Sequence, residues 1–278
     1  MSTVPSLLTA LVDDAAIFPP ASSPLSEAVK AHLEHRASAY ADLLGPFVIS
    51  DIRLPDLLEV LDDEQEPLPV TVVVTGGAGA IEPAVRWATK SGLLDVRAIE
   101  TPLRDEDDLA RNASRVVTVI DQLRGEIGEI PVHVEPPRVP RGPGRGWLAA
   151  LDEVAAAGLR LKFRTGGVEP DAFPSSAELA TSIDAALDRE LAFKCTAGLH
   201  HAVRQGHQHG FLNILAATGG AFDGAGLDEV IEILDTEGID QLGGPERLTV
   251  GRRWFTSFGC CAVEDPLEDL VELGLVRL

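Results

Sequence analysis

Residues 160–167 read Arg-Leu-Lys-Phe-Arg-Thr-Gly-Gly, a short alternating pattern that ends in a glycine turn. Side chains two positions apart on a strand point to the same face, so Lys162 and Arg164 share one face and Leu161 and Phe163 share the other. Charged side chains are seldom buried unless they are paired or functional. The stretch therefore predicts a strand with helices packed on its apolar face and a polar site on its opposite face.

The same alternation of strand and helix recurs along the chain about every 24–32 residues. The expected strands are Phe47–Ser50, Val70–Thr75, Val96–Glu100, Val132–Glu135, Arg160–Arg164, Ala192–Thr196 and Phe255–Ala262. Repeated strand–helix units are typical of a parallel sheet covered by helices. Charged residues recur at the ends of several strands, which favours a barrel over a doubly wound sheet with one switch point.

We therefore predict an α/β fold, a (β/α)8 TIM-like barrel that forms one domain over residues 1–278. The pattern degrades after Thr196, so we expect an irregular region around the seventh strand. Either the barrel is incomplete there, or the N-terminal segment supplies the missing element.

The formal charge of −21, from 23 basic and 44 acidic residues, disfavours nucleic acid and anionic membranes as partners. The three cysteines do not suffice for a disulfide framework, which indicates the cytoplasm. We expect a small anionic metabolite as the partner, and the sequence leaves a homo-oligomer open.

Polar pairs follow three consecutive expected strands. Lys194 and Thr196 share a strand face, as do His133 and Glu135, in the same way as the basic pair of residues 160–167. A lysine in a dry pocket beside other cations loses basicity and can act as a Schiff-base nucleophile. The competing interpretation is a structural network of salt bridges between Glu135 and the basic residues.

These patterns predict an enzyme, a lyase of aldolase type or a related isomerase, that acts on a small anionic carbonyl compound. The candidate catalytic residues are Lys194, Lys162, Glu135, His133 and His200. The candidate substrate-binding residues are Arg164, Thr196, Gly166, Gly167 and His201. Lys194 would form the Schiff base or stabilise an enolate, the other basic residues would hold the anion, and the histidines and Glu135 would move protons. Asp51 and Glu100, at the ends of the first and third expected strands, are further candidates for a general base.

Four of the seven histidines lie between His200 and His209. No cofactor is predicted, but these histidines together with His133 and Glu135 leave open a metal-dependent hydrolase or lyase that uses a divalent ion. A non-catalytic barrel that binds carboxylates is a third alternative.

Two resemblances accompany these patterns. Phe193–Gly198, which reads FKCTAG, resembles the lysine strand of deoxyribose-phosphate aldolase and related Schiff-base aldolases, and implies that Lys194 ends the sixth strand. The chain departs from that family in showing no second lysine on a following strand. The blocks VDDAAIFPPA (residues 12–21), KFRTGG (162–167), KCTAGLHH (194–201) and FTSFGC (255–260) resemble a family of uncharacterised bacterial barrel-like proteins, which implies no particular mechanism.

Overall fold

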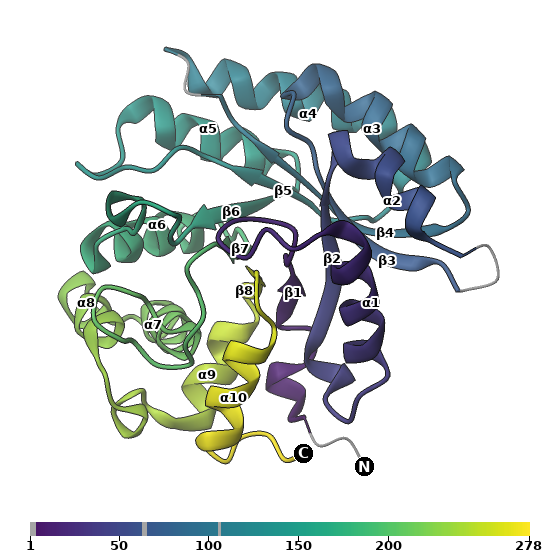
Figure 1. Cartoon of the computed structure of the whole chain (residues 1–278). Coiled ribbons are helices and arrows are strands. Elements are labelled where there is room, and N and C mark those ends of the chain that lie inside the picture. Colours follow the sequence, from purple (N-terminus) through teal and green to yellow (C-terminus); the bar gives the residue numbers. More distant parts are fainter. Residues whose placement is uncertain (1–3, 63–65, 105–106) are drawn as a thin grey trace.

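The structure, a computed structural model, describes residues 4–62, 66–104 and 107–278. Eight parallel strands close into a barrel in the order of the sequence, and helices surround them (Figure 1). The strands are β1 (Val12–Asp14), β2 (Leu44–Ser50), β3 (Leu68–Val73), β4 (Leu94–Pro102), β5 (Val132–Glu135), β6 (Arg160–Arg164), β7 (Phe193–Thr196) and β8 (Phe255–Cys260). The predicted (β/α)8 barrel is thus confirmed.

The strand missing from the sequence pattern is β1, at the N-terminal end of the chain. It pairs in parallel with both β2 and β8, so segments from opposite ends of the sequence lie side by side and close the barrel (Figure 1). Counting from β1 places Lys162 on the sixth strand and Lys194 on the seventh. The expectation that Lys194 ends strand six is therefore wrong by one strand.

Ten α-helices cover the barrel in the described part of the chain. They are α1 (Leu25–Arg36), α2 (Leu54–Val60), α3 (Ala78–Lys90), α4 (Leu109–Ile127), α5 (Arg145–Ala156), α6 (Ser176–Leu187), α7 (Phe211–Phe222), α8 (Leu227–Asp235), α9 (Gly244–Arg252) and α10 (Glu264–Glu272). The irregular region is the connection from β7 to β8, which contains α7, α8 and α9. Helix α7 is buried along most of its length and contacts α6, α8, α9 and β8, so the apolar run of residues 211–222 is a core helix.

The two faces of β6 differ as the alternation predicts. Leu161 and Phe163 are buried, and Phe163 lines a small cavity together with Trp147 of α5 and Leu179 of α6. Lys162 points to the interior of the barrel instead. Among the described residues, no helix has the length and apolar character needed to cross a membrane.

Candidate active site

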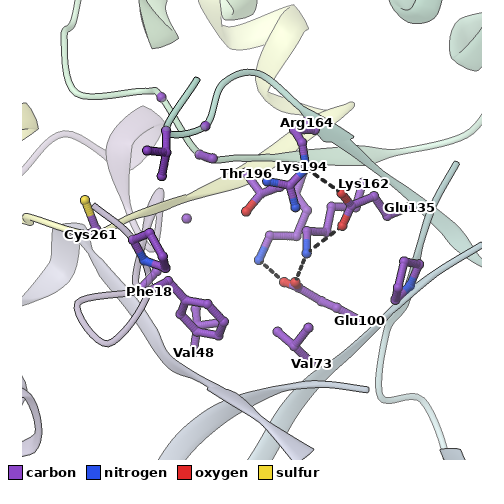
Figure 2. Close-up of a pocket in the computed structure, with 18 of the residues that line it drawn as sticks. Phe18, Val48, Val73, Glu100, Glu135, Lys162, Arg164, Lys194, Thr196 and Cys261 are labelled. Atoms are coloured by element: carbon purple, nitrogen blue, oxygen red, sulfur yellow. Dashed lines mark hydrogen bonds and ion pairs between the residues drawn. The ribbon is translucent and has the colours of Figure 1, made fainter. Parts of the chain in front are cut away.

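A chain of buried ion pairs crosses the interior of the barrel. The Lys194 Nζ pairs with Asp13 and lies 2.5 Å from Glu100 Oε1. The Lys162 Nζ lies 2.6 Å from Glu100 Oε2 and 3.1 Å from Glu135 Oε2. Glu100 therefore holds one lysine on each oxygen (Figure 2). These five side chains are at most 12% exposed, so the pairs lie largely away from water.

The series of ion pairs continues toward solvent at the C-terminal ends of the strands. Arg164 Nε lies 3.0 Å from Glu135 Oε1, and this arginine side chain is 44% exposed. Arg164 and Thr196 pair in the strand register one layer above Lys162 and Lys194. The site thus has a buried layer of lysines and carboxylates and an outer layer that reaches the rim of the barrel.

The carboxylates keep both lysines charged. Burial alone lowers the pKa of Lys194, but the attraction of Asp13 and Glu100 outweighs it, so the pKa is raised above its ordinary value. Lys162 is affected in the same direction, because Glu100 and Glu135 outweigh its burial and raise its pKa. The expectation that Lys194 loses basicity among cations is therefore wrong, because carboxylates surround it.

The two lysines in turn lower the pKa of Glu100. Its burial raises the pKa, but the attraction of Lys162 and Lys194 is stronger, and the pKa of this carboxyl ends well below its ordinary range. At the other end of the chain, Ser257 Oγ donates a hydrogen bond of 2.9 Å to Asp13 Oδ2. Each ion of the buried layer thus contacts at least one opposite charge, as buried ions require, but three carboxylates face two lysines, and burial raises the pKa of Asp13.

His133 lies beside Glu100 in the register of β4 and β5 and is 4% exposed. Neither of its ring nitrogens hydrogen-bonds to another described residue. Burial, and then the charge of Lys194, lower its pKa to about 3. His133 is therefore neutral at pH 7 and does not line the cavity above the cluster.

A cavity of about 440 Å³ opens above the ion pairs (Figure 2). The predicted site residues Lys162, Arg164, Lys194, Thr196, Glu135, Gly167 and His200 line it together with Glu100. Phe18, Pro19 and Pro20, from the loop after β1, and Cys261, directly after β8, are also in its wall. A mostly apolar wall with one charged patch suits a small polar ligand.

The remaining predicted residues lie elsewhere. His201 lies 3.5 Å from Asp269 and does not line the cavity. Gly166 is also outside the lining, and it serves close packing: a Cβ there would lie 2.7 Å from the Gly198 Cα. Asp51 accepts a hydrogen bond of 2.8 Å from Thr75, on the exposed connection after β2.

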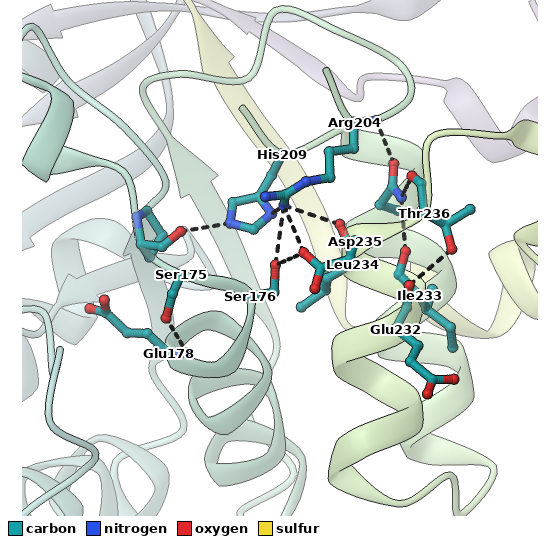
Figure 3. A network of polar contacts seen from close by, with 12 residues as sticks. Ser175, Ser176, Glu178, Arg204, His209, Glu232, Ile233, Leu234, Asp235 and Thr236 are labelled. Carbon is teal, nitrogen blue, oxygen red and sulfur yellow. Dashed lines mark hydrogen bonds and ion pairs between the residues drawn. The ribbon is translucent and has the colours of Figure 1, made fainter. Parts of the chain in front are cut away.

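Most of the histidine-rich loop is anchored to helices (Figure 3). His209 Nε2 is 2.9 Å from the carbonyl of Pro174, and Arg204 donates to His209 Nδ1 at 3.1 Å. The same arginine reaches Ser176 on α6 and Asp235 on α8. Among the residues that the structure describes, no group of three or more histidine, cysteine or acidic side chains is placed to hold a metal. The metal-ligand set considered from the sequence is therefore dispersed.

Sequence reasoning missed the central position of Glu100 and the role of Asp13. The signal for Glu100 was its place at the end of an expected strand. Asp13 lies on a strand of only three residues, too short for an alternating pattern to reveal.

No protein-family model matches the chain, and a search of curated proteins also finds no match. Barrels of this architecture commonly carry enzyme active sites at the C-terminal ends of their strands, which is where this cavity lies.

Proposed function

We propose that this protein is an enzyme that acts on a small anionic carbonyl compound through a lysine Schiff base, as an aldolase-type lyase or a related isomerase. One observation supports this most: two buried lysines share one carboxylate, Glu100, beneath a cavity at the C-terminal mouth of the barrel. Charged groups in such a mouth are typical of catalysis in this fold, although the fold alone assigns no reaction.

The carboxylates resolve the difficulty that Lys194 starts as an ammonium ion. Asp13, whose burial raises the pKa of its carboxyl, accepts a proton from Nζ, and the freed amine attacks the substrate carbonyl carbon, whose π electrons move to oxygen. That oxygen takes one proton from the attacking nitrogen and a second from Asp13 and leaves as water, so an iminium ion remains and Asp13 is a carboxylate again. The iminium carries the same positive charge at the same place as the ammonium did, so the ion pairs with Asp13 and Glu100 persist.

The iminium then withdraws electrons from the neighbouring carbon. Either a carbon–carbon bond breaks, as in a lyase, or a proton leaves that carbon, as in an isomerase; both give an enamine. Glu135 lines the cavity and supplies an acceptor for that proton.

Arg164 is suited to hold the anionic group of the substrate. Among the described residues its carboxylate partner is Glu135, which it contacts through Nε. None of the described residues hydrogen-bonds to its terminal nitrogens, and a guanidinium fork matches a carboxylate or phosphate. In this proposal the substrate anion binds at the rim and its carbonyl carbon faces the lysines.

Borohydride trapping tests the proposal. The protein is incubated with a panel of small aldehydes and 2-oxo acids, reduced with sodium borohydride and mapped by peptide mass spectrometry. We expect a stable adduct on Lys194. Lys194→Arg keeps the positive charge between Asp13 and Glu100 but cannot form an imine, so it should abolish the adduct. Lys90→Arg, at the exposed end of α3, is the matched control.

Three outcomes would contradict the proposal. Turnover of a panel compound without any trapped adduct removes the Schiff-base mechanism. Saturable binding of carboxylates with no turnover across the panel favours the non-catalytic alternative. An adduct on Lys162 in place of Lys194 overturns the assignment of the nucleophile.

A further inference from the structure

A second group of reactive side chains faces the same cavity. His200, on the loop after β7, places Nε2 3.8 Å from the sulfur of Cys261 and Nδ1 2.7 Å from Asp265 Oδ2. Asp265 belongs to α10, and Cys261 follows β8. Both His200 and Cys261 line the cavity, whereas Asp265 lies behind the imidazole. The Schiff-base mechanism uses none of these three residues.

Thiol, imidazole and carboxylate lie in the order that activates a nucleophile. Asp265 accepts a hydrogen bond from Nδ1–H, which leaves Nε2 to take the proton of the Cys261 thiol. Burial raises the pKa of the Cys261 thiol, but its contact with His200 outweighs burial and lowers the pKa below its ordinary value. Contacts with Cys260 and Cys261 raise the pKa of His200 to about 11.

The neighbouring Cys260 provides an internal contrast. Its sulfur also lies 3.8 Å from His200, at Nδ1, but it donates to the carbonyl of Ala262 and is 2% exposed. Burial raises the pKa of this thiol, and Cys260 does not line the cavity. Cys195 is fully buried, and its burial raises its pKa strongly. Cys261 is thus the thiol that combines a basic partner with access to a ligand.

We propose that Cys261 is a second reactive centre of this cavity, a nucleophile activated by His200 and Asp265 that forms a reversible covalent adduct with small aldehydes or ketones. The thiolate sulfur bonds to the carbonyl carbon, and the π electron pair of the C=O bond moves to oxygen. That oxygen takes the proton from His200 Nε2. The product is a hemithioacetal or hemithioketal, and no oxidant or other reactant is needed.

The position of Cys261 gives this adduct a role. Figure 2 shows its sulfur on the opposite side of the cavity from Lys162, Lys194 and Glu100. A carbonyl compound held between them meets an amine on one side and a thiolate on the other. The ligand class therefore rests on the proposed function, but the reactivity of the thiol does not, because it depends on different residues.

Alkylation by iodoacetamide tests the thiol directly. The full-length protein is labelled between pH 5.5 and 9, and the rate at each cysteine is followed by peptide mass spectrometry. We expect Cys261 to react first, with an apparent pKa below the value of about 8.5 for an ordinary thiol. His200→Asn should raise that pKa and slow labelling at pH 7 on the order of tenfold, because the thiolate fraction falls.

The adjacent residues supply matched controls. His201 lies 3.5 Å from Asp269 and outside the cavity, so His201→Asn should leave the labelling of Cys261 unchanged. Asp265→Asn should slow labelling, whereas Asp269→Asn should not. Equal rates at the three cysteines, or equal effects of His200→Asn and His201→Asn, would overturn the proposal.

Protection by glyoxylate, a small aldehyde that carries a carboxylate, tests the ligand class. Glyoxylate should slow the labelling of Cys261, and dialysis should restore the rate. Unchanged labelling at saturating glyoxylate overturns the carbonyl ligand. The Lys194→Arg variant separates the two proposals: loss of borohydride trapping with retained Cys261 reactivity supports independent centres. Loss of Cys261 reactivity in that variant, with the fold intact by circular dichroism, overturns the independence of the thiol.

Discussion

Glu100 is the residue on which the buried layer depends. It contacts both lysines, whereas the two other carboxylates of the buried layer each contact one lysine. Asp13 pairs with Lys194, and Glu135 pairs with Lys162. The sequence placed Glu100 at a strand end, but a strand pattern states only which face a residue occupies. Its partners depend on how strands from distant parts of the chain meet in the barrel, which no local pattern records.

We expect Glu100→Gln to lower the free energy of unfolding by about 3–5 kcal/mol, because it removes a charge that both buried ammonium groups need. Urea unfolding monitored by circular dichroism measures the change. The control is Glu126→Gln, which breaks an exposed pair with Arg86 and should change the free energy of unfolding far less. Similar costs for the two variants would show that the buried ion pairs do not stabilise the fold.

His133 predicts a pH dependence with a definite sign. Its pKa is about 3 in the folded protein, against an ordinary value of 6.5. As the pH falls below 6.5, the unfolded chain takes up a proton that the folded protein excludes, so the unfolding free energy should decrease by up to about 1.4 kcal/mol per pH unit. His133→Leu should reduce this slope between pH 6.5 and 4.5. Parallel curves for the variant and the unaltered protein would contradict the assignment.

At the scale of elements, two glycines allow the backbones that follow β6 and β7 to approach closely. Thr165 N donates to the Thr196 carbonyl at 2.9 Å, and just beyond this bond Gly166 and Gly198 approach closely. A Cβ on Gly198 would lie 2.8 Å from the Gly166 Cα and 2.8 Å from the Phe173 ring. Gly198 lines the cavity at this contact, whereas Gly166, which the sequence suggested as an anion ligand, lies outside the lining and serves close packing.

Gly198→Ala should therefore destabilise the fold in two ways, through its φ of +74° and through crowding. The matched control is Gly206→Ala, whose φ is +58° but which has no atom within 4 Å of the added carbon. We expect the control to cost about 1–2 kcal/mol for the left-handed backbone alone. Gly198→Ala should cost about 1–3 kcal/mol more, from overpacking. Thermal unfolding measures both, and equal losses would exclude a packing role for this contact.

At the scale of the whole molecule, the barrel was predictable because most strands have an apolar face that must pack under helices. The basic face of β6 was predictable for the same reason. The sequence left open whether the barrel is incomplete or the N-terminal segment supplies the missing strand, because β1 has three residues and is recognised only through its pairing with β2 and β8. Because the sequence pattern did not reveal β1, the strand count was one too low and Asp13 was not recognised as a partner of Lys194. Lys194 was therefore expected among cations rather than between carboxylates. The error in its basicity thus follows from the error in topology.

The charge of −21 leads to a last prediction, about the surface and the interior together. Repulsion among surface carboxylates opposes the compact state, and salt screens it because the Debye length falls to about 10 Å at 0.1 M. The unfolding midpoint should therefore rise as KCl increases from 10 mM to 500 mM. The interior pairs are screened far less, so the stability difference between the unaltered protein and Glu100→Gln should stay constant across that range. Urea unfolding at each salt concentration measures both quantities. A difference that shrinks with salt would place Glu100 in contact with solvent ions and contradict the buried cluster.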